Sequence, residues 1–247
     1  MIDTVTLDFW GTLLTDTPEN TERAKTVRLE RVGMLLARSG HRVTFQALTR
    51  AYDLSGQEMG RRWREHRDWT IREQLHSFLQ ALAPDLPREL GGEILHEIEE
   101  AYITPALSYP PELSPGAAAA VGALHEAGLT LCVISNSGRT PGVILRKLLE
   151  RHGLLSLFTV VTFSDELSYR KPHPEIFLET LKKAGRDAAR AVHVGDDAEA
   201  DVGGAKGVGM RAIHYCPNGD ATAAPTPPDA TLSRFDDLPA LIRGLLA

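Results

Sequence analysis

Short runs of hydrophobic residues, rich in Val and Ile, recur along the chain, and segments of helical length separate the later ones. These runs predict strands at 3–9, 129–135, 158–164, 191–196 and 210–215. The stretches at 116–128 and 174–185 predict helices between them. Strands that alternate with such helices are typical of a parallel sheet with helices on both faces, where each strand is buried on both sides. The pattern therefore predicts an α/β fold.

The interval between the first and second predicted strands breaks this alternation. It reads as successive helices at 21–40, 47–66, 69–83 and 87–103. Gly40 is suited to end the first of these helices, and Thr44 to precede the second. An insertion this long is better explained by a separate helical domain than by a simple crossover. We therefore predict a core of 1–14 and 108–247 and a helical cap of 15–107, with linkers at 13–18 and 105–115.

The composition is that of an ordinary globular protein, with 43% hydrophobic and 24% charged residues. A formal net charge of −6 argues against general nucleic-acid binding. Cys132 and Cys216 are the only cysteines, and we expect free thiols in a reducing compartment. The chain opens without a signal-peptide pattern and has no hydrophobic stretch of about 18 residues. We expect a cytoplasmic monomer or homodimer that binds neither nucleic acid nor membrane.

Polar side chains stand at the ends of four predicted strands. In open parallel sheets, ligands bind outside the carboxyl ends of the strands, so these residues are expected to lie close together. They are Asp8 at the end of the first strand, Ser135 and Asn136 at the second, Lys171 after the third, and Asp196, Asp197 and Asp201 at the fourth.

These residue types fit one chemistry. A carboxylate such as Asp8 can attack phosphorus or an activated carbon and form an ester that water later cleaves. Ser135 and Thr12 can hold nonbridging oxygens, while Lys171 neutralises charge and keeps the nucleophile ionised. Several carboxylates in one site repel one another unless a cation joins them. The acidic residues Asp8, Asp196 and one or both of Asp197 and Asp201 therefore suit Mg²⁺, which prefers oxygen ligands.

The four strand ends carry the motifs "LDFWGTLL", "VISNS", "RKPHPEIF" and "GDDAEAD" in that order. With them the chain resembles the haloacid dehalogenase (HAD) superfamily, in the branch whose helical cap is inserted after the first strand. The resemblance implies a Rossmann-like parallel-sheet core, Asp8 as nucleophile, and Thr12, Ser135 and Lys171 as its catalytic partners. It also implies that the backbone carbonyl of Trp10 is a metal ligand and that the substrate is a small, phosphorylated molecule.

Substrate contacts are expected from the loops and from the cap. Trp10, Gly11 and Asn136 are the candidates in the loops, and Arg61 and Arg64 are the candidates in the cap. The cap arginines allow two interpretations, a solvated helix face or a surface that grips the substrate.

Trp10 departs from the pattern of the phosphatases in this superfamily. They carry a second Asp at that position, which protonates the leaving group and then activates water. An indole can do neither, and loss of general acid–base catalysis typically costs about 10²–10⁴-fold in rate. Dehalogenases of the superfamily carry an aromatic Tyr at that position and need no metal. This chain differs from them in other ways, because their fourth motif has Ser and Asn in place of Asp196 and Ala198. They also carry Tyr where this chain has Phe177.

We therefore predict a hydrolase of phosphate esters or anhydrides that uses Asp8 and Mg²⁺. Two alternatives remain open at this point. One is a 2-haloacid dehalogenase-like hydrolase. The other is a non-catalytic descendant that binds a phosphorylated ligand or a protein.

Overall fold

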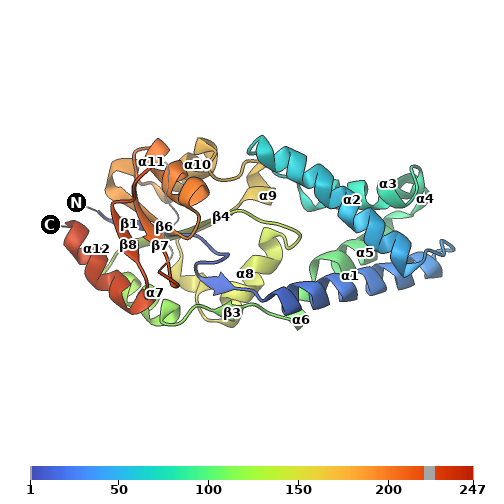
Figure 1. The fold of residues 1–247 in the computed structure, drawn as a ribbon, viewed down its shortest axis with the longest axis horizontal. Coiled ribbons are helices and arrows are strands. Elements are labelled where there is room, and N and C mark those ends of the chain that lie inside the picture. The colour runs from blue at the N-terminus through green and yellow to red at the C-terminus, as the bar shows by residue number, and fades with distance from the viewer. Residues whose placement is uncertain (1, 220–225, 247) are drawn as a thin grey trace.

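The computed structural model describes residues 2–219 and 226–246, and its central feature is a six-stranded parallel sheet. The strand order is β5-β4-β1-β6-β7-β8 (Figure 1). The strands are β1 (Thr4–Leu7), β4 (Thr130–Ser135), β5 (Val160–Phe163), β6 (Ala191–Gly195), β7 (Arg211–Tyr215) and β8 (Ala230–Leu232). The α/β prediction is confirmed. Strand β8 was missed because three residues are too few to give a pattern.

Strand β1 lies in the middle of the sheet and is buried along its whole length. Its Leu7 pairs with Val133 of β4 on one side and with Val194 of β6 on the other. Because the three strands are parallel and in register, their carboxyl ends meet at one edge of the sheet. The residue that follows β1, Asp8, therefore emerges at the centre of that edge.

Helices cover both faces of the sheet, and each face has its own hydrophobic cluster. Leu148, Val121 and Ile242 belong to one cluster, and Phe177 and Met210 to the other. The helices are α7 (Ala117–Glu126), α8 (Gly142–Arg151), α9 (Ser164–Leu167), α10 (Pro174–Ala184), α11 (Gly204–Gly207) and α12 (Leu238–Leu246). Shorter turns are η1 (Leu155–Leu157), η2 (Ala188–Arg190), the π-helical η3 (Ala198–Gly203) and η4 (Phe235–Asp237).

The inserted segment forms a separate helical cap at one end of an elongated molecule (Figure 1). Its helices are α1 (Pro18–Arg38), α2 (Phe45–Arg64), α3 (Ile71–Leu82), α4 (Leu86–Glu89), α5 (Gly92–Ile103) and α6 (Pro105–Ser108). The side chains of Thr17, Thr44 and Thr70 cap the first three helices by accepting from backbone N–H groups. Helix α1 starts earlier than its pattern predicts because Thr17 is followed by Pro18, which suits a first helical turn.

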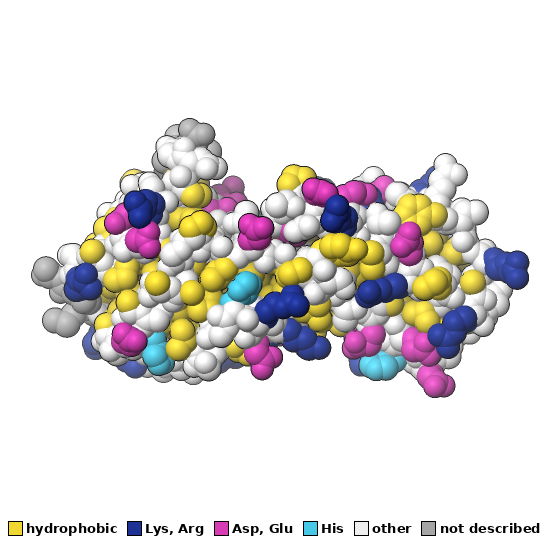
Figure 2. Space-filling view, turned by 90° about the horizontal axis from the view of Figure 1, so that it is seen from below, with side chains coloured by type: hydrophobic (Ala, Val, Ile, Leu, Met, Phe, Trp, Pro, Cys, Tyr) yellow, Lys and Arg dark blue, Asp and Glu magenta, His cyan; other side chains and the backbone are white. Residues whose placement is uncertain are grey.

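The linker segments carry a second, two-stranded sheet. Strand β2 (Leu14–Thr15) pairs antiparallel with β3 (Glu112–Leu113), so the chain enters and leaves the cap side by side. The domain boundaries at 14/15 and 107/108 stay a prediction, and these two strands lie beside them. Within the described residues, no helix is both long and hydrophobic enough to cross a membrane. On the face drawn in Figure 2, acidic and basic side chains are interspersed over core and cap.

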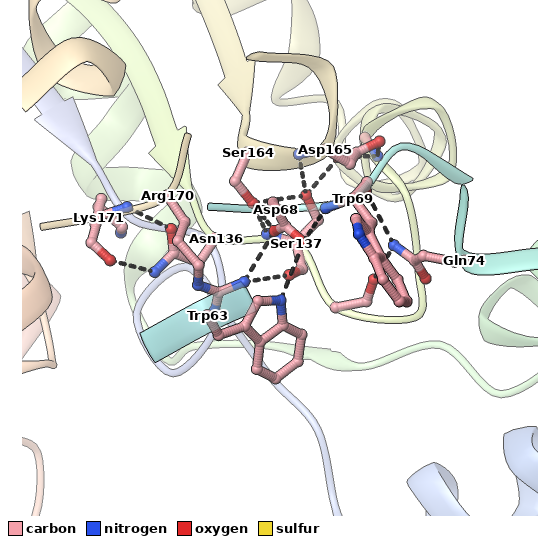
Figure 3. A network of polar contacts seen from close by, with 12 residues as sticks. Trp63, Asp68, Trp69, Gln74, Asn136, Ser137, Ser164, Asp165, Arg170 and Lys171 are labelled. Atoms are coloured by element: carbon pink, nitrogen blue, oxygen red, sulfur yellow. Dashed lines mark hydrogen bonds and ion pairs between the residues drawn. The ribbon is translucent and has the colours of Figure 1, made fainter. Parts of the chain in front are cut away.

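A buried carboxylate joins the cap to the core. Asp68, which follows α2, accepts hydrogen bonds from the Trp63 indole (3.0 Å) and the Trp69 N–H (2.8 Å) within the cap. It also accepts from Ser164 Oγ (2.5 Å) and Arg170 Nη1 (2.8 Å), which belong to the core (Figure 3). The Arg170 guanidinium lies 4.1 Å from the centre of the Trp63 ring. Cap and core therefore share an ion pair in which Asp68 is buried and Arg170 is mostly buried.

We predict that Asp68→Ala lowers the free energy of unfolding by about 3–5 kcal/mol, because Asp68 is buried and its loss leaves the mostly buried Arg170 charge without its ion-pair partner. The measurement is urea denaturation monitored by tryptophan fluorescence. Asp85→Ala is the matched control in the cap, since the Asp85–Arg88 pair is exposed and such pairs contribute about 0–1 kcal/mol. Equal losses in the two variants would contradict a structural role for the Asp68 pair.

Candidate active site

A lysine lies between two carboxylates at the centre of the carboxyl edge. Lys171 Nζ is 2.5 Å from Asp8 Oδ1 and 2.5 Å from Asp201 Oδ1. All three residues are buried, with exposed fractions of 3% for Lys171, 5% for Asp8 and 1% for Asp201. The three groups come from the end of β1, the loop after β5 and the turn after β6. Folding of the sheet therefore brings together residues that are far apart in the sequence.

The pKa values in this group depend on burial and on the mutual charges. Burial raises the pKa of Asp8, and the opposing effect of Lys171 does not fully offset it. Burial alone would lower the pKa of Lys171, but the carboxylates of Asp201 and Asp8 outweigh burial and raise it. Burial would raise the pKa of Asp201 as well, but Lys171 and His193 hold it below its usual range. The site therefore contains an ammonium, an Asp201 whose pKa is lowered, and an Asp8 whose pKa burial raises.

Asp196 completes an acidic cluster beside Asp8. Its Oδ1 accepts a hydrogen bond from Thr12 Oγ1 at 3.2 Å. Gly11 has φ +73°, and a Cβ at that position would lie 2.3 Å from Asp196 Oδ2, so only glycine allows this approach. Although the residue is exposed at the mouth of the site, burial of its carboxyl group and the charges of Asp8 and Asp201 raise the pKa of Asp196 to about 7.

The cluster fits a hard divalent cation. One carboxylate oxygen from each of Asp8, Asp196 and Asp201 lies within 4.8 Å of the other two. Three carboxylates against a single ammonium leave an excess of negative charge, which adds to the effect of burial on the pKa values of Asp8 and Asp196 and favours Mg²⁺ with oxygen ligands. Asp201 Oδ1 is also 2.9 Å from His193 Nε2, and its Oδ2 accepts from the Asp197 N–H at 2.9 Å. Asp8 and Asp196 are therefore freer to coordinate a cation.

Asp197 lies outside this cluster. Its Oδ1 accepts from the backbone N–H groups of Glu199 (2.9 Å) and Ala200 (2.7 Å), so the side chain caps the turn that follows β6. The sequence left open which of Asp197 and Asp201 joins the metal site. The geometry favours Asp201, because the capping hydrogen bonds direct the Asp197 carboxylate toward its own turn.

Ser135 and Asn136 differ in how their side chains are used. Ser135 Oγ is buried and, within the described part of the chain, has no partner that meets both the distance and the angle of a hydrogen bond. A buried hydroxyl without a partner at the carboxyl edge suits a ligand oxygen. In contrast, the side-chain oxygen of Asn136 accepts a hydrogen bond from the Lys171 N–H at 2.7 Å, and its side-chain nitrogen donates to the Lys171 carbonyl at 3.1 Å. Its amide therefore holds the lysine loop and is not free for substrate.

A cavity of about 260 Å³ lies between cap and core beside Trp10. The indole is half-buried, packs edge-on against Phe9 at 4.9 Å, and lines this cavity. Arg61 and Arg64, the predicted cap contacts, do not line it. Both are exposed on α2, and Arg61 pairs with Glu58. They occupy a solvated helix face, which was one of the two interpretations of these arginines.

The cavity contains two arginines that the sequence motifs did not reveal, Arg28 of α1 and Arg139 of the loop after β4. Each has a pattern that points to it once the fold is known. Arg28 stands four residues after Ala24 and four before Val32, on the buried stripe of α1. Arg139 stands four residues after Ser135, in the same strand-end loop. The motifs also did not single out His193, which is buried beside the site and contacts Asp201.

An aspartate and a lysine at the centre of a parallel sheet, beneath a helical cap, define a capped α/β hydrolase. The family model for haloacid dehalogenase-like hydrolases matches residues 2–209, and the chain belongs to that family. The resemblance seen in the four motifs is thereby confirmed.

Curated relatives in this family include phosphatases. The phosphoglycolate phosphatase of Salmonella paratyphi A is 31% identical over 160 residues, which are 64% of this chain and 62% of that protein. The ribulose-1,5-bisphosphate 5-phosphatase of Halopiger xanaduensis is 33% identical over 53% of this chain and 54% of its own length. The chain thus matches less than two thirds of the length of either relative.

Among solved structures, the 2-haloacid dehalogenase of Pseudomonas syringae pv. tomato is similar to this chain from end to end. It has a TM-score of 0.72 and 27% identity, and covers 99% of this chain and 100% of its own. Similarity therefore extends to both phosphatases and dehalogenases, and the residues of the site must distinguish between them.

Another buried carboxyl group, that of Asp165, belongs to the polar network drawn in Figure 3. Asp165 Oδ1 accepts from Ser137 Oγ and from the Gly142 N–H, the latter at 3.1 Å. Burial raises the pKa of Asp165 to about 6, although both of these hydrogen bonds oppose the change. The folded state therefore binds the proton more tightly than the unfolded state, whose carboxyl group has a pKa near 3.8. The contribution of protonated Asp165 to the stability of the folded state is complete below pH 3.8 and is lost as the pH rises through about 6.

We predict that Asp165→Asn removes this pH dependence, because an amide still accepts from Gly142 but does not titrate. Between pH 4 and pH 7, wild type should lose about 2–3 kcal/mol more stability than the variant. Urea denaturation of both proteins at half-unit pH intervals measures this difference. The contributions of the other carboxyl groups cancel because the two proteins share them. Parallel profiles for the two proteins would show that Asp165 has an ordinary pKa.

Proposed function

We propose that this hydrolase cleaves phosphate esters or anhydrides of small molecules, with Asp8 as nucleophile and Mg²⁺ as cofactor. The observation that carries the proposal is the acidic cluster of Asp8, Asp196 and Asp201 around a single lysine. Such a cluster would repel the carboxylate of a haloacid, whereas with a divalent cation it suits a phosphoryl group. The phosphatases among the curated relatives support the same substrate class.

Each residue has a role in this chemistry. A carboxylate oxygen of Asp8 attacks phosphorus, the bond from phosphorus to the leaving group breaks, and an aspartyl-phosphate forms that water later hydrolyses. Lys171 neutralises charge, and the hydroxyls of Ser135 and Thr12 donate to the nonbridging oxygens.

The cation site and the substrate contacts belong to the same proposal. Asp8, Asp196, the carbonyl of Trp10 and one of Asp201 and Asp197 would hold Mg²⁺, which supplies charge neutralisation when bound. Gly11 and Trp10 would contact the substrate through the loop after β1.

A second candidate is 2-haloacid dehalogenation. Two observations favour it, namely the full-length similarity to a dehalogenase at 27% identity and the aromatic residue at position 10. Halide leaves without a proton, so this reaction needs no acid at that position. The acidic residue Asp196 argues against it, because an uncompensated carboxylate lies where the haloacid carboxylate would bind. Metal dependence distinguishes the two reactions.

We predict that the protein hydrolyses members of a panel of aryl, acyl and sugar phosphates only when Mg²⁺ is present. Asp8→Asn should reduce kcat at least about 10³-fold, because it removes the nucleophile. Asp187→Asn, on an exposed loop, is the control for handling and folding. Release of halide from 2-chloropropionate in excess chelator would contradict the proposal in favour of dehalogenation. Binding of phosphate without any turnover would favour the ligand-binding alternative.

We predict that Trp10 slows the second half-reaction most. Water attacking the aspartyl-phosphate needs a base, so rapid quenching of wild type with an aryl phosphate should show a burst followed by slow turnover. Trp10→Asp should raise the steady-state rate by about 10²-fold or more. Trp10→Asn is the matched control, because it has the same size and no proton to transfer. Both variants create a cavity that can cost about 3–5 kcal/mol, so their folding is checked first. Equal rates in the two variants would mean that position 10 has no acid–base role.

A further inference from the structure

Two arginines line the cavity beside Trp10, and all of their hydrogen-bond partners among the described residues are neutral oxygens. Arg28 is only 3% exposed and donates to the Tyr102 carbonyl (2.5 Å) and the Tyr52 hydroxyl (3.0 Å). Arg139 is half-buried and donates to Ser55 Oγ (3.0 Å), the Tyr52 carbonyl (2.6 Å) and the Tyr102 hydroxyl. Neither guanidinium forms an ion pair within the described ranges.

Aromatic rings offset part of this charge. The Arg139 guanidinium lies 3.9 Å from the centre of the Tyr52 ring, and that of Arg28 lies 5.1 Å from the centre of the Tyr102 ring. Contacts of this kind are weak beside the cost of removing a guanidinium from water, and buried charges in proteins are normally paired with an opposite charge. The cavity therefore has an unbalanced positive potential.

Donors remain available for a ligand. Nη2 of Arg28 and Nε of Arg139 donate to no oxygen of the described residues. The one acidic side chain in the cavity lining is Asp16, and its oxygens accept from the Thr17 N–H at 2.9 Å and Thr21 Oγ1 at 3.3 Å. Both donors are neutral, so Asp16 keeps its charge, and the lining has two guanidinium groups against one carboxylate, which leaves a net positive charge.

The cap is shaped to admit Arg139. A Cβ on Gly56 of α2 would lie 2.8 Å from Arg139 Nη2, so a glycine in the middle of this helix makes room for the guanidinium. Every partner of Arg139 is a neutral oxygen. A side chain with neutral donors could therefore hold cap and core together at this position equally well. Retaining a charge there carries a desolvation cost, which an anionic ligand would offset.

We propose that this cavity binds a second anionic group of the substrate, a carboxylate or phosphate oxyanion, and that Arg28 and Arg139 determine specificity. The inference rests on the proposed function for the position of the reacting phosphoryl group at Asp8. The cavity adjoins the loops of the site, since its lining includes Trp10, two residues after Asp8, and Gly138 and Thr140, which follow Ser135 at the end of β4. Figure 1 shows this loop extending from β4 toward the cap.

The test compares matched aryl phosphates in the full chain with Mg²⁺. Substrates are 3-carboxyphenyl phosphate, phenylene-1,3-bisphosphate and the neutral 3-carbamoylphenyl phosphate, which has nearly the shape of the first. We expect kcat/KM to favour a charged substrate over the neutral one by about 10- to 100-fold, the usual range for a hydrogen-bonded charge. The preferred charged substrate identifies the oxyanion as carboxylate or phosphate.

Variants at Thr140, a lining residue with no hydrogen bond among the described residues, avoid disturbing the buried arginines. Thr140→Asp places a carboxylate of the protein itself in the cavity. The ratio of kcat/KM for the charged substrate to kcat/KM for the neutral one should then fall close to one. Thr140→Asn is the size-matched neutral variant and should keep the wild-type ratio. A purely structural role for the arginines predicts that both variants leave the ratio as it is in wild type.

A binding measurement separates this inference from the proposed function. Malonate, a dicarboxylate without phosphate, is titrated calorimetrically in magnesium-free buffer into wild type and both variants. Hydrolysis of charged and neutral substrates at equal kcat/KM, without malonate binding, would overturn the inference and leave the phosphatase proposal intact. Malonate binding that Thr140→Asp abolishes and Thr140→Asn keeps, without hydrolysis of any ester, would support the anion site and overturn the phosphatase. Failure of both measurements overturns both.

Discussion

The buried ammonium of Lys171 between Asp8 and Asp201 is the interaction on which the rest of the site depends. Removing these three charges from water is costly, and the cost is tolerable only while each has its partners. Lys171 and Asp201 have further partners. Asn136 holds the backbone of Lys171, while His193 and the Asp197 N–H satisfy the remaining oxygens of Asp201. This requirement fixes the relative positions of three strand-end loops before any substrate binds.

The same loops are attached to the cap, so the position of the cap and the geometry of the site are linked. Arg170 precedes Lys171 and forms an ion pair with Asp68 of the cap, as Figure 3 shows. Arg139 follows Ser135 in the neighbouring loop and reaches Ser55 and the tyrosines of the cap. A movement of the cap would therefore pull on the loops that follow Ser135 and precede Lys171. Residues that have no chemical role can still affect the reaction through these attachments.

The sequence was sufficient for features that are local in the chain. Hydrophobic runs located five of the six parallel strands, and the polar residues at their ends located Asp8, Lys171 and Asp196, because parallel strands bring their carboxyl ends to one edge. Contacts across the cap could not be predicted in this way. Nothing local in the sequence shows that Arg139 enters a cavity or that Arg61 is solvated, because both depend on how the cap packs against the core.

The choice between Asp197 and Asp201 shows the same limit at shorter range. Both follow β6 within a few residues, and both are carboxylates next to a turn. What separates them is the path of the backbone. Asp197 precedes the π-helical turn and caps it, whereas Asp201 lies within that turn and faces Lys171. These roles depend on where the turn starts, and sequence patterns do not fix the start of a helix to the residue.

The loss of the usual acid at position 10 has a different weight for different substrates. A leaving group without charge must receive a proton or depart as an unstable anion. Two arginines lie beside Trp10, so a leaving group that carries its own anionic group would stay near positive charge as it departs. That positive charge would stabilise the negative charge that develops on the oxygen of the leaving group. On this argument, the indole and the arginines act together on substrate selection. Trp10 removes the acid, and the cavity restores part of the lost stabilisation only for substrates that can fill it.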